Sequence, residues 1–523
     1  MINYSALEEV LSKMKNEVLF TIAKDPSYDT VNDADRLEGL MKKRELEPYY
    51  DNNFVEDFVA AKRRTGVDFS FNWSARNAPG EWMSQNIRTP SSVIDEPISL
   101  GEIEAQLSSS RFSHVVIATY LSGYSTFREI SRYVHRAHPD VKVVAASVGA
   151  LIPESQELAD YLVKGDLVGD LRDILGERRE DALKPVTMRS DSETIYKGQH
   201  KKASYGILAS SLGCMYGCDF CPSTAQFGTS YSAPFSAEQI RGAIIQSHDQ
   251  IAPDDKEFTI SIAEPQGLGN IKLWKSIFEV CRNLPFVCNL ISTTSSKVIQ
   301  GYTLDELTGG NLRLATVNIG VESQLKVYRK NQGAELKRVY DWLQNAGINV
   351  ASTLILGLDW HDQENVWEEV RLLKALESSI NIVASLEMQP NTPLYNQYKR
   401  QGRLLDVPPE LLSFYGYQAF LHPNFRQGFN DMLPLLDDIK GELYGGDVTL
   451  GRNLDVFLNR KAPHEERVRV QISQAVQDFG RNLDPSAYHD GGTSAIRAHA
   501  TDLYFKYGFR QVDLFYPFIL STN

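Results

Sequence analysis

The chain has 523 residues, of which 42% are hydrophobic and 23% are charged, and its formal net charge at pH 7 is −13. This composition is typical of a globular protein with full-sized cores, and the length predicts about three domains. Binding to phosphates needs clustered Lys and Arg, so the acidic balance argues against a nucleic-acid-binding surface as the main function. No apolar run approaches the roughly 18–20 residues that span a bilayer, and the first residues are mixed in charge and lack the apolar core expected of a signal peptide. We therefore expect a cytoplasmic protein without a membrane span.

Residues 1–175 alternate short β-branched runs with helical stretches. Strands are predicted at 17–23, 67–73, 113–120, 141–149 and 159–166, and helices at 126–138 and 153–159. This alternation predicts a Rossmann-like (flavodoxin-like) parallel sheet, which binds ligands at the carboxyl ends of its strands. Those ends include small residues that would let a ligand approach the backbone. They carry Tyr120, Leu121, Ser122, Gly123, Ser147, Val148, Gly149 and Gly165.

Residues 176–204 are polar and lack an apolar period, so we expect a surface linker there.

From residue 205 the alternation of strands and helices restarts. Strands are predicted at 205–211, 257–263, 287–293, 314–322, 350–357 and 380–388, and helices at 235–251, 271–284, 334–347 and 365–378. Ser236 is placed as an N-cap and Gly347 as a C′ glycine. The pattern predicts a partial (β/α)6 TIM-like barrel over 205–405 and a mainly helical C-terminal domain over 406–523 that caps the active site.

Three of the five cysteines lie within eight residues, at Cys214, Cys218 and Cys221, directly after the first predicted barrel strand. This clustering argues against a disulfide framework. A structural zinc site needs four ligands, and a C-x-x-C redox pair leaves Cys214 without a role. Three thiolates that held a 4Fe–4S cluster would leave one iron open to a substrate or cofactor.

A C-x3-C-x2-C motif after the first strand of a βα barrel, with Phe220 just before the third cysteine, resembles the radical S-adenosylmethionine superfamily. The resemblance implies that Cys214, Cys218 and Cys221 hold a 4Fe–4S cluster whose fourth iron is chelated by S-adenosylmethionine. It also implies that reduction cleaves this cofactor to methionine and a 5′-deoxyadenosyl radical, and that Phe220 packs near the adenine. A zinc site or structural cysteines are the alternative.

Two acidic segments resemble motifs of the same superfamily. Residues 262–265 resemble its Gly-Gly-Glu-Pro, which implies that Glu264 receives the cofactor's amino group, although the two glycines are absent. Residues 318–323 resemble its "IGxES" segment, which implies that Glu322 and Ser323 contact the ribose or methionine part of the cofactor.

Two later segments extend the resemblance. Residues 354–358 resemble the strand that passes the adenine, which implies a backbone role for Ile355 and Gly357. The Pro-Gly-Glu-Thr that usually follows is replaced by Asp-Trp-His-Asp at 359–362. Residues 390–404 resemble the "PGTPLY…GRL" stretch, a subfamily marker rather than a ligand set.

That marker is typical of radical enzymes with a cobalamin-binding domain in front, and residues 114–175 resemble the segment that those enzymes share. The resemblance implies that the residues at the strand ends of the N-terminal sheet contact cobalamin. No Asp-x-His-x-x-Gly motif marks a histidine as the lower cobalt ligand, so Tyr120 or Leu121 would approach that face. The alternative is a domain that binds nothing and only supports the barrel.

The resemblance as a whole implies a cobalamin-dependent radical S-adenosylmethionine enzyme that methylates an unactivated carbon of a small molecule or natural product. It implies an electron donor such as flavodoxin or ferredoxin. A rearrangement without methyl transfer (cyclisation or ring contraction) is one alternative. A cobalamin-free radical enzyme whose front domain is structural or binds a partner is the other. The motifs specify cofactor ligands and no catalytic residue.

Four other residues are candidates for the site. Cys281 and Cys288 are isolated on a predicted helix and a predicted strand, so we expect buried small hydrophobic side chains. His361 and His422 lie near the expected edge of the active site, and we expect structural or surface histidines, with a substrate contact as the alternative.

Overall fold

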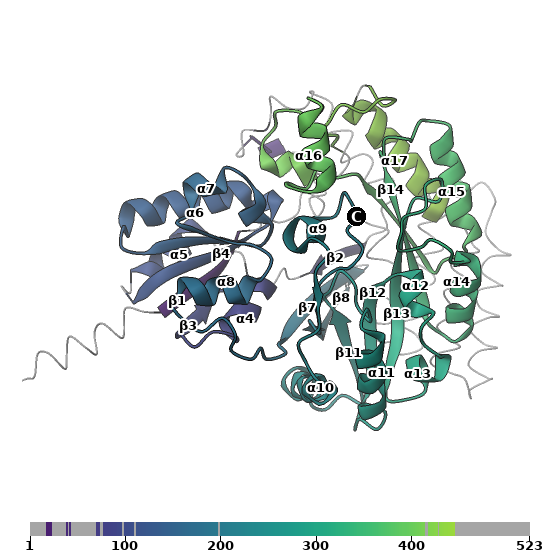
Figure 1. The fold of residues 1–523 in the computed structure, drawn as a ribbon, viewed down its shortest axis with the longest axis horizontal. Helices are drawn as coiled ribbons and strands as arrows, with labels where there is room; N and C mark the ends of the chain where they lie inside the picture. The colour runs from purple at the N-terminus through teal and green to yellow at the C-terminus, as the bar shows by residue number, and fades with distance from the viewer. Residues whose placement is uncertain are drawn as a thin grey trace, which may run out of the picture.

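Two sheets, one near the N-terminus and one in the middle of the chain, form the frame of the computed structural model (Figure 1). The helix α9 (Pro222–Phe227) lies between them. The structure describes residues 17–23, 38–39, 41–42, 46, 69–73, 77–96, 99–108, 111–196, 199–413, 417–426 and 428–444.

The N-terminal sheet is parallel throughout, in the order β3–β1–β4–β5–β6. Its strands are β1 (Glu17–Ala23), β3 (Ser91–Val93), β4 (Phe112–Thr119), β5 (Lys142–Ala146) and β6 (Tyr161–Val163). Alternate residues of β1 and β4 join different apolar clusters, with Val18 and Val116 on one face and Leu19 and Val115 on the other. Burial on both faces is typical of a parallel sheet covered by helices. The predicted Rossmann-like sheet is therefore confirmed.

Helices cover both faces of this sheet (Figure 1). One face packs against α4 (Ala78–Ser84) and α8 (Leu167–Ile174). The other packs against α5 (Leu100–Leu107) and α6 (Tyr124–Ala137). The short α7 (Ser155–Leu158) precedes β6.

The second sheet has the order β15–β14–β13–β12–β11–β8–β7–β2. Six neighbouring strands are parallel: β8 (Gln199–Leu208), β11 (Glu257–Ile262), β12 (Val287–Thr294), β13 (Leu312–Glu322), β14 (Asn349–Leu356) and β15 (Ile380–Ser385). The helices between them are α10 (Ala237–Ile251), α11 (Ile271–Val280), α12 (Ser296–Ile299), α13 (Leu304–Thr308), α14 (Leu336–Asn345) and α15 (Asn365–Ala375). Consecutive parallel strands of this kind confirm the predicted partial barrel.

The predicted helix ends are also confirmed. Ser236 caps α10 in a capping box with Gln239, and Gly347 follows α14 with φ +80°. Each device satisfies backbone groups that a helix end leaves without an intrahelical partner.

Two predictions about the join between the units are wrong. The expected linker at 176–204 contains β7 (Thr187–Tyr196), which pairs antiparallel with β8. The strand expected near 67–73 is β2 (Phe69–Trp73), which pairs with β7 in the second sheet rather than with the N-terminal sheet. The physical reason is that β7 is mostly polar, so the apolar pattern of a buried strand is absent, and pairing rather than burial makes it a strand.

Both apolar clusters contain residues of the two units, and the one on the α5 and α6 face joins their candidate ligand edges. It contains Leu121 and Ile152 of the N-terminal unit together with Ile355, Leu386 and Leu394 of the barrel side. After β15 the chain forms α16 (Pro393–Arg400), the 3-10 helix η5 (Pro409–Ser413) and α17 (Phe429–Tyr444). The rest of the predicted helical C-terminal domain, from residue 445, lies outside the described residues.

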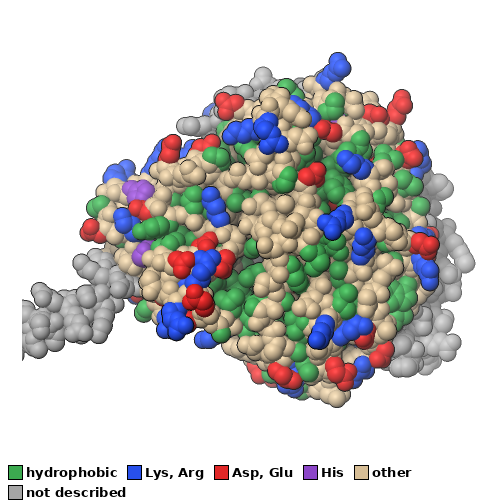
Figure 2. All heavy atoms as spheres, in the orientation of Figure 1, with side chains coloured by type: hydrophobic (Ala, Val, Ile, Leu, Met, Phe, Trp, Pro, Cys, Tyr) green, Lys and Arg blue, Asp and Glu red, His purple; other side chains and the backbone are tan. Residues whose placement is uncertain are grey.

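The surface in Figure 2 shows Lys and Arg side chains interspersed with Asp and Glu, so neither sign dominates that face. Among the described helices, none has the length and apolar character that crossing a bilayer requires.

Candidate cluster and cofactor site

The three clustered cysteines lie on the loop between the end of β8 and α9, at the carboxyl edge of the barrel. All three are free thiols and half-buried. Gly213 (φ +80°) and Gly217 (φ +63°) let this loop turn back on itself, in conformations that L-residues avoid. The loop is pinned by β9 (Leu212–Gly213), which pairs with β10 (Tyr231–Ser232). The loop therefore lies where a βα barrel binds its ligands.

Burial makes the thiols of Cys214 and Cys218 costly to ionise without a cation. Burial raises the pKa of Cys218 to about 11, an increase that Lys330 reduces and Cys221 adds to. The pKa of Cys214 is raised by the same burial. A metal centre would supply the missing positive charge, because a coordinating thiol is deprotonated outright.

The three thiols on this loop suit a multi-iron cluster. In the described part of the chain, no three His, Cys, Asp or Glu side chains are placed to hold one metal ion. Each thiolate of a 4Fe–4S cluster binds a different iron, so the sulfur atoms need not converge on one point. Three thiols on one loop therefore suit such a cluster.

Cys281 and Cys288 are fully buried in the core of the barrel unit, as predicted. Burial raises the pKa of Cys281 to about 12, and that of Cys288 is raised for the same reason. These two thiols are packing residues.

Glu264 lies just after β11, at the same edge as the cysteine loop, and is buried. Its carboxylate accepts hydrogen bonds from the backbone N–H groups of Ser210 and Ser211, the latter at 2.9 Å, and from the Ser211 hydroxyl. Burial raises the pKa of this carboxyl, while the two serines lower it. Glu264 thus fixes the start of the cysteine loop.

Glu322 ends β13 with φ +63° and forms an ion pair with Lys330, and their side chains are only 9% and 15% exposed. A Cβ on Gly320 would collide with both charged groups, so the glycine makes room for the pair. Burial would lower the pKa of Lys330, but Glu322 and Cys218 hold it above its usual value, so the ammonium stays charged. Sequence reasoning missed Lys330, because one lysine in a polar loop carries no signal.

Ser323 is buried beside the same edge, but its hydroxyl is already engaged. It donates to Glu369 of α15, whose carboxylate also accepts the N–H groups of Gln324 (2.7 Å) and Leu325 (3.3 Å). His361 lies on the other side, with Nε2 at 3.5 Å from Glu369 Oε1. Glu369 therefore fixes the loop that follows β13.

Replacing Glu369 with Gln is expected to lower the unfolding free energy near neutral pH by about 1.5–3 kcal/mol, the range for hydrogen bonds to a charged group. Burial would raise the pKa of Glu369, but hydrogen bonds from His361, Ser323 and two backbone amides hold it below 4.5. A depressed folded-state pKa gives stability that is present above the unfolded value and lost as the pH falls through the folded value. The difference between wild type and variant should therefore shrink as the pH falls below 4.5.

Urea denaturation across an acidic pH series measures this difference. The neighbouring Glu368 is exposed, so Glu368→Gln is the matched control and should change stability by no more than about 0.5 kcal/mol. A pH-independent difference between wild type and Glu369→Gln would contradict the assignment.

The two candidate histidines are structural, as expected. The Nδ1 atom of His361 faces the N–H groups of Gly357 (3.2 Å) and Leu358 (3.3 Å). The Nδ1 atom of His422 accepts from Asn424 and Phe425, and its Nε2 lies 3.0 Å from the carbonyl oxygen of Leu358. Both rings therefore fix the loop after β14.

Ile355, Gly357 and Phe220 also lie at this edge. Gly357 follows β14 with φ +89°, and a Cβ there would come 2.9 Å from Met432 Cε of α17. Phe220 is half-buried and meets Tyr328 edge-on, with 5.4 Å between ring centroids. Tyr328 in turn lies 6.4 Å from Trp360, so three aromatic rings extend from the cysteine loop.

The eight residues expected at the N-terminal edge all lie there, at the carboxyl ends of β4, β5 and β6. They occupy Tyr120, η3 (Leu121–Gly123), the start of η4 (Ser147–Leu151) and Gly165. A Cβ on Gly165 would come 2.6 Å from the carbonyl oxygen of Gln226, the penultimate residue of α9. This glycine lets the helix that follows the third cysteine rest directly on the N-terminal edge, so the two candidate edges meet (Figure 1).

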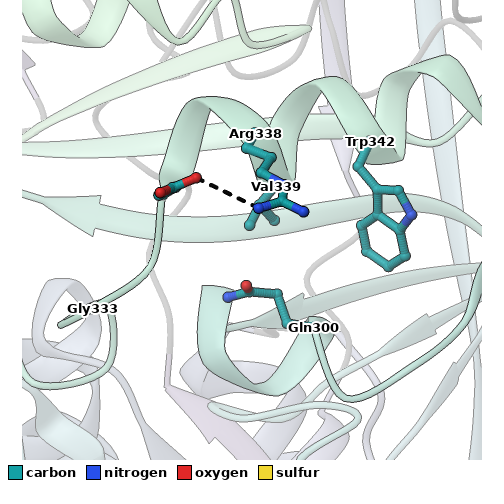
Figure 3. Close-up of a pocket in the computed structure, with 6 residues that line it drawn as sticks. Gln300, Gly333, Arg338, Val339 and Trp342 are labelled. Atoms are coloured by element: carbon teal, nitrogen blue, oxygen red, sulfur yellow. Dashed lines mark ion pairs between the residues drawn. The ribbon is translucent and has the colours of Figure 1, made fainter.

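A pocket of about 440 Å³ lies elsewhere, between the end of α12 and α14. Figure 3 shows Arg338 and Trp342 on α14 facing Gln300 across it. Its one ion pair, between Glu335 and Arg338 at 3.8 Å, is exposed. None of the predicted site residues lines this pocket.

No family model matches the chain. A curated relative, the hopanoid C-2 methylase of Rhodopseudomonas palustris (strain TIE-1), is 24% identical over 315 residues. The match covers 55% of this chain and 58% of the relative, and so spans less than two thirds of the relative's length.

Solved structures share the fold. The radical S-adenosylmethionine methyltransferase TsrM from Kitasatospora setae, with cobalamin and a [4Fe-4S] cluster bound, has a TM-score of 0.55 and 12% identity, and the match covers 90% of this chain and 100% of that chain. The cobalamin-dependent S-adenosylmethionine radical enzyme OxsB, with aqua-cobalamin and S-adenosylmethionine bound, has a TM-score of 0.53 and 14% identity, over 96% and 76% of the two chains. TsrM with tryptophan substrate and aza-SAM bound has a TM-score of 0.50 and 12% identity, over 74% and 76%. The predicted fold is confirmed.

Proposed function

We propose that this chain is a cobalamin-dependent radical S-adenosylmethionine enzyme. The proposal starts from two premises, the fold that the chain has in common with such enzymes and the motifs that resemble theirs. The observation that carries the proposal is that the carboxyl edge of the barrel lies against the carboxyl edge of the N-terminal sheet. The cysteine loop lies at the carboxyl edge of the barrel, and α9 rests against Gly165 at the carboxyl edge of the N-terminal sheet. Two cofactor sites at these edges would face each other.

The residues present fit the expected cofactors. Cys214, Cys218 and Cys221 would hold a 4Fe–4S cluster, and Glu322 and Lys330 offer opposite charges for the carboxylate and ammonium of S-adenosylmethionine. When bound, these groups and cobalamin supply one-electron cleavage and a transferable methyl group.

The chain's own part is to orient these groups and to exclude water. Glu264 fixes the start of the cysteine loop, and Glu369 fixes the loop after β13, each as a buried multiple acceptor. Tyr120 and the residues of η3 and η4 would form the floor of the cobalamin site. We assign residues 1–175, apart from β2, to the cobalamin domain, 205–405 to the radical barrel and 406–523 to a cap.

The reaction we propose is methylation of an unactivated carbon of a small molecule or natural product. The names of the hopanoid methylase and of TsrM support methyl transfer, and tryptophan is the substrate bound in one TsrM structure. Reductive cleavage needs one electron from outside, so the proposal includes a donor such as flavodoxin or ferredoxin.

The test is anaerobic purification with hydroxocobalamin, followed by cluster reconstitution and a visible spectrum. We expect corrinoid bands on top of broad iron–sulfur absorption, and 5′-deoxyadenosine after addition of S-adenosylmethionine and dithionite. A metabolite extract with methyl-labelled S-adenosylmethionine would then reveal the labelled product. A spectrum without corrinoid bands would favour the cobalamin-free alternative, and the absence of 5′-deoxyadenosine would refute radical chemistry.

A further inference from the structure

The segment from Pro390 to Arg403 carries a sequence motif that none of the cofactor contacts above uses. It contains α16, which follows the last barrel strand, and it touches three parts of the molecule that are far apart in sequence. Each contact involves a loop at one of the two edges.

The first contact is with the N-terminal unit. Asn391 has φ +60°, a conformation in which Asn is enriched among non-glycine residues. In this conformation its Nδ2 donates a hydrogen bond to the carbonyl oxygen of Leu151, at the end of η4. Asn396 of α16 donates to the Asn391 carbonyl at 3.3 Å and holds the turn.

The second contact is with the cysteine loop. The N–H of Leu394 donates to the carbonyl oxygen of Asp219, which lies between the second and third cysteines, at 2.9 Å. This donor is available because the first N–H groups of a helix have no intrahelical acceptor, and the Thr392 side chain caps a different one. Thr392 caps the N–H of Tyr395 at 3.1 Å, and Pro393 has no N–H.

The third contact is with the loop after β14. Asp359 accepts two hydrogen bonds from Arg403, at 2.6 and 2.8 Å, and one from the Tyr398 hydroxyl at 2.5 Å. The Arg403 guanidinium also lies over the Tyr398 ring, 3.9 Å from its centroid. This paired geometry is both strong and directional. It gives a role to Asp359, which begins the segment that replaces the usual Pro-Gly-Glu-Thr.

We propose that Pro390–Arg403 is a strut that sets the spacing between the η4 edge and the cysteine loop, with Asn391 as the positioning residue. The inference rests on the proposed function, because that spacing is the one between cobalamin and the cluster. The strut is anchored by buried Leu394 and Tyr398 in the apolar cluster that joins both units. A change in spacing would therefore break at least one of the three contacts.

The test compares Asn391→Asp with Gln397→Glu in the holoenzyme. Both variants replace an amide with a carboxylate on the same segment, but Gln397 is exposed and no contact given above uses its side chain. Asn391→Asp keeps the side-chain shape and the backbone conformation, and it turns an oxygen rather than a donor toward Leu151. Asn391→Gly, which also accepts φ above zero, removes the donor without adding charge.

Two measurements report on the strut. Pulsed electron paramagnetic resonance gives the distance distribution between the reduced cluster and cob(II)alamin. We expect this distribution to be broader than in the wild type in both Asn391 variants and unchanged in Gln397→Glu. The yield of 5′-deoxyadenosine per transferred methyl group should rise by about tenfold, since a misplacement of about 1 Å can cost up to about 10²-fold in rate.

An unchanged distance distribution in cofactor-loaded Asn391→Asp and Asn391→Gly would overturn the strut alone. A wild-type protein that retains the cluster but no corrinoid would refute the proposed function, and with it the role of the strut in cofactor spacing. A broadened distribution in Gln397→Glu would show that any added charge on the segment suffices, and would also overturn the assignment to Asn391.

Discussion

Replacing Cys214, Cys218 and Cys221 together with Ala is expected to abolish both the bound iron and the formation of 5′-deoxyadenosine. Each thiolate binds a different iron of a 4Fe–4S cluster, so single Ala variants should already lose most of the iron. Iron and sulfide analysis after anaerobic reconstitution measures the first effect, and chromatography of the products measures the second.

The matched control is Cys281→Ala. This cysteine is also a free thiol, but it is fully buried in the core of the barrel unit. The Cys281→Ala variant should keep the iron content and the 5′-deoxyadenosine yield of the wild type. Retained cleavage in the triple variant, or loss of iron in Cys281→Ala, would contradict the assignment of the cluster to the β8–α9 loop.

Replacing Lys330 with Met is expected to destabilise the protein by about 3–5 kcal/mol, the usual cost of leaving one partner of a buried ion pair uncompensated. Glu322 would then remain buried with its charge unmatched, in the middle of the candidate site. Chemical denaturation of the apoprotein measures the effect without any cofactor. In the loaded enzyme, loss of the nearby positive charge should also weaken binding of S-adenosylmethionine.

Two further variants distinguish the loss of a buried ion pair from the mere loss of a lysine. Lys337→Met removes a lysine whose ion pairs with Asp341 and Glu377 are largely exposed, so it should cost less than about 1 kcal/mol. The double variant Glu322→Gln with Lys330→Met removes both charges and should recover part of the lost stability. Equal destabilisation by Lys330→Met and Lys337→Met would show that the Glu322–Lys330 ion pair is not buried.

Strands with continuous apolar runs were predictable from the sequence, because burial on both faces leaves a pattern in the residues themselves. The strands β1, β4 and β14 have this pattern, whereas the first half of β8 is polar. The hairpin partner β7 does not, since its residues are mostly polar and its place in the sheet depends on pairing with β8. Its antiparallel neighbour β2 could be predicted as a strand but not assigned to its sheet.

Some features of the candidate site were likewise predictable from the sequence, and others were not. The cysteine spacing is local in sequence, so it could be predicted. The partners of Glu264 lie more than fifty residues away in sequence, and Lys330 has a role only because β13 ends beside the cysteine loop. Likewise, Ser323 was expected to face the cofactor, but the structure shows that its hydroxyl is bonded to Glu369. Such contacts depend on how loops meet at a sheet edge, which residue patterns do not specify.

The apolar cluster shared by the two units has a consequence for how this architecture can be recombined. A fragment that ended near residue 175 would leave Leu121 and Ile152 without the barrel-side partners Ile355, Leu386 and Leu394. The N-terminal unit is therefore not an exchangeable module, because the edge proposed to bind cobalamin also packs against the barrel side. Transfer of the N-terminal unit to another protein would also require the apolar residues of α16 that pack against it. We therefore expect substitutions at the contact in one unit to be accompanied by substitutions in the other.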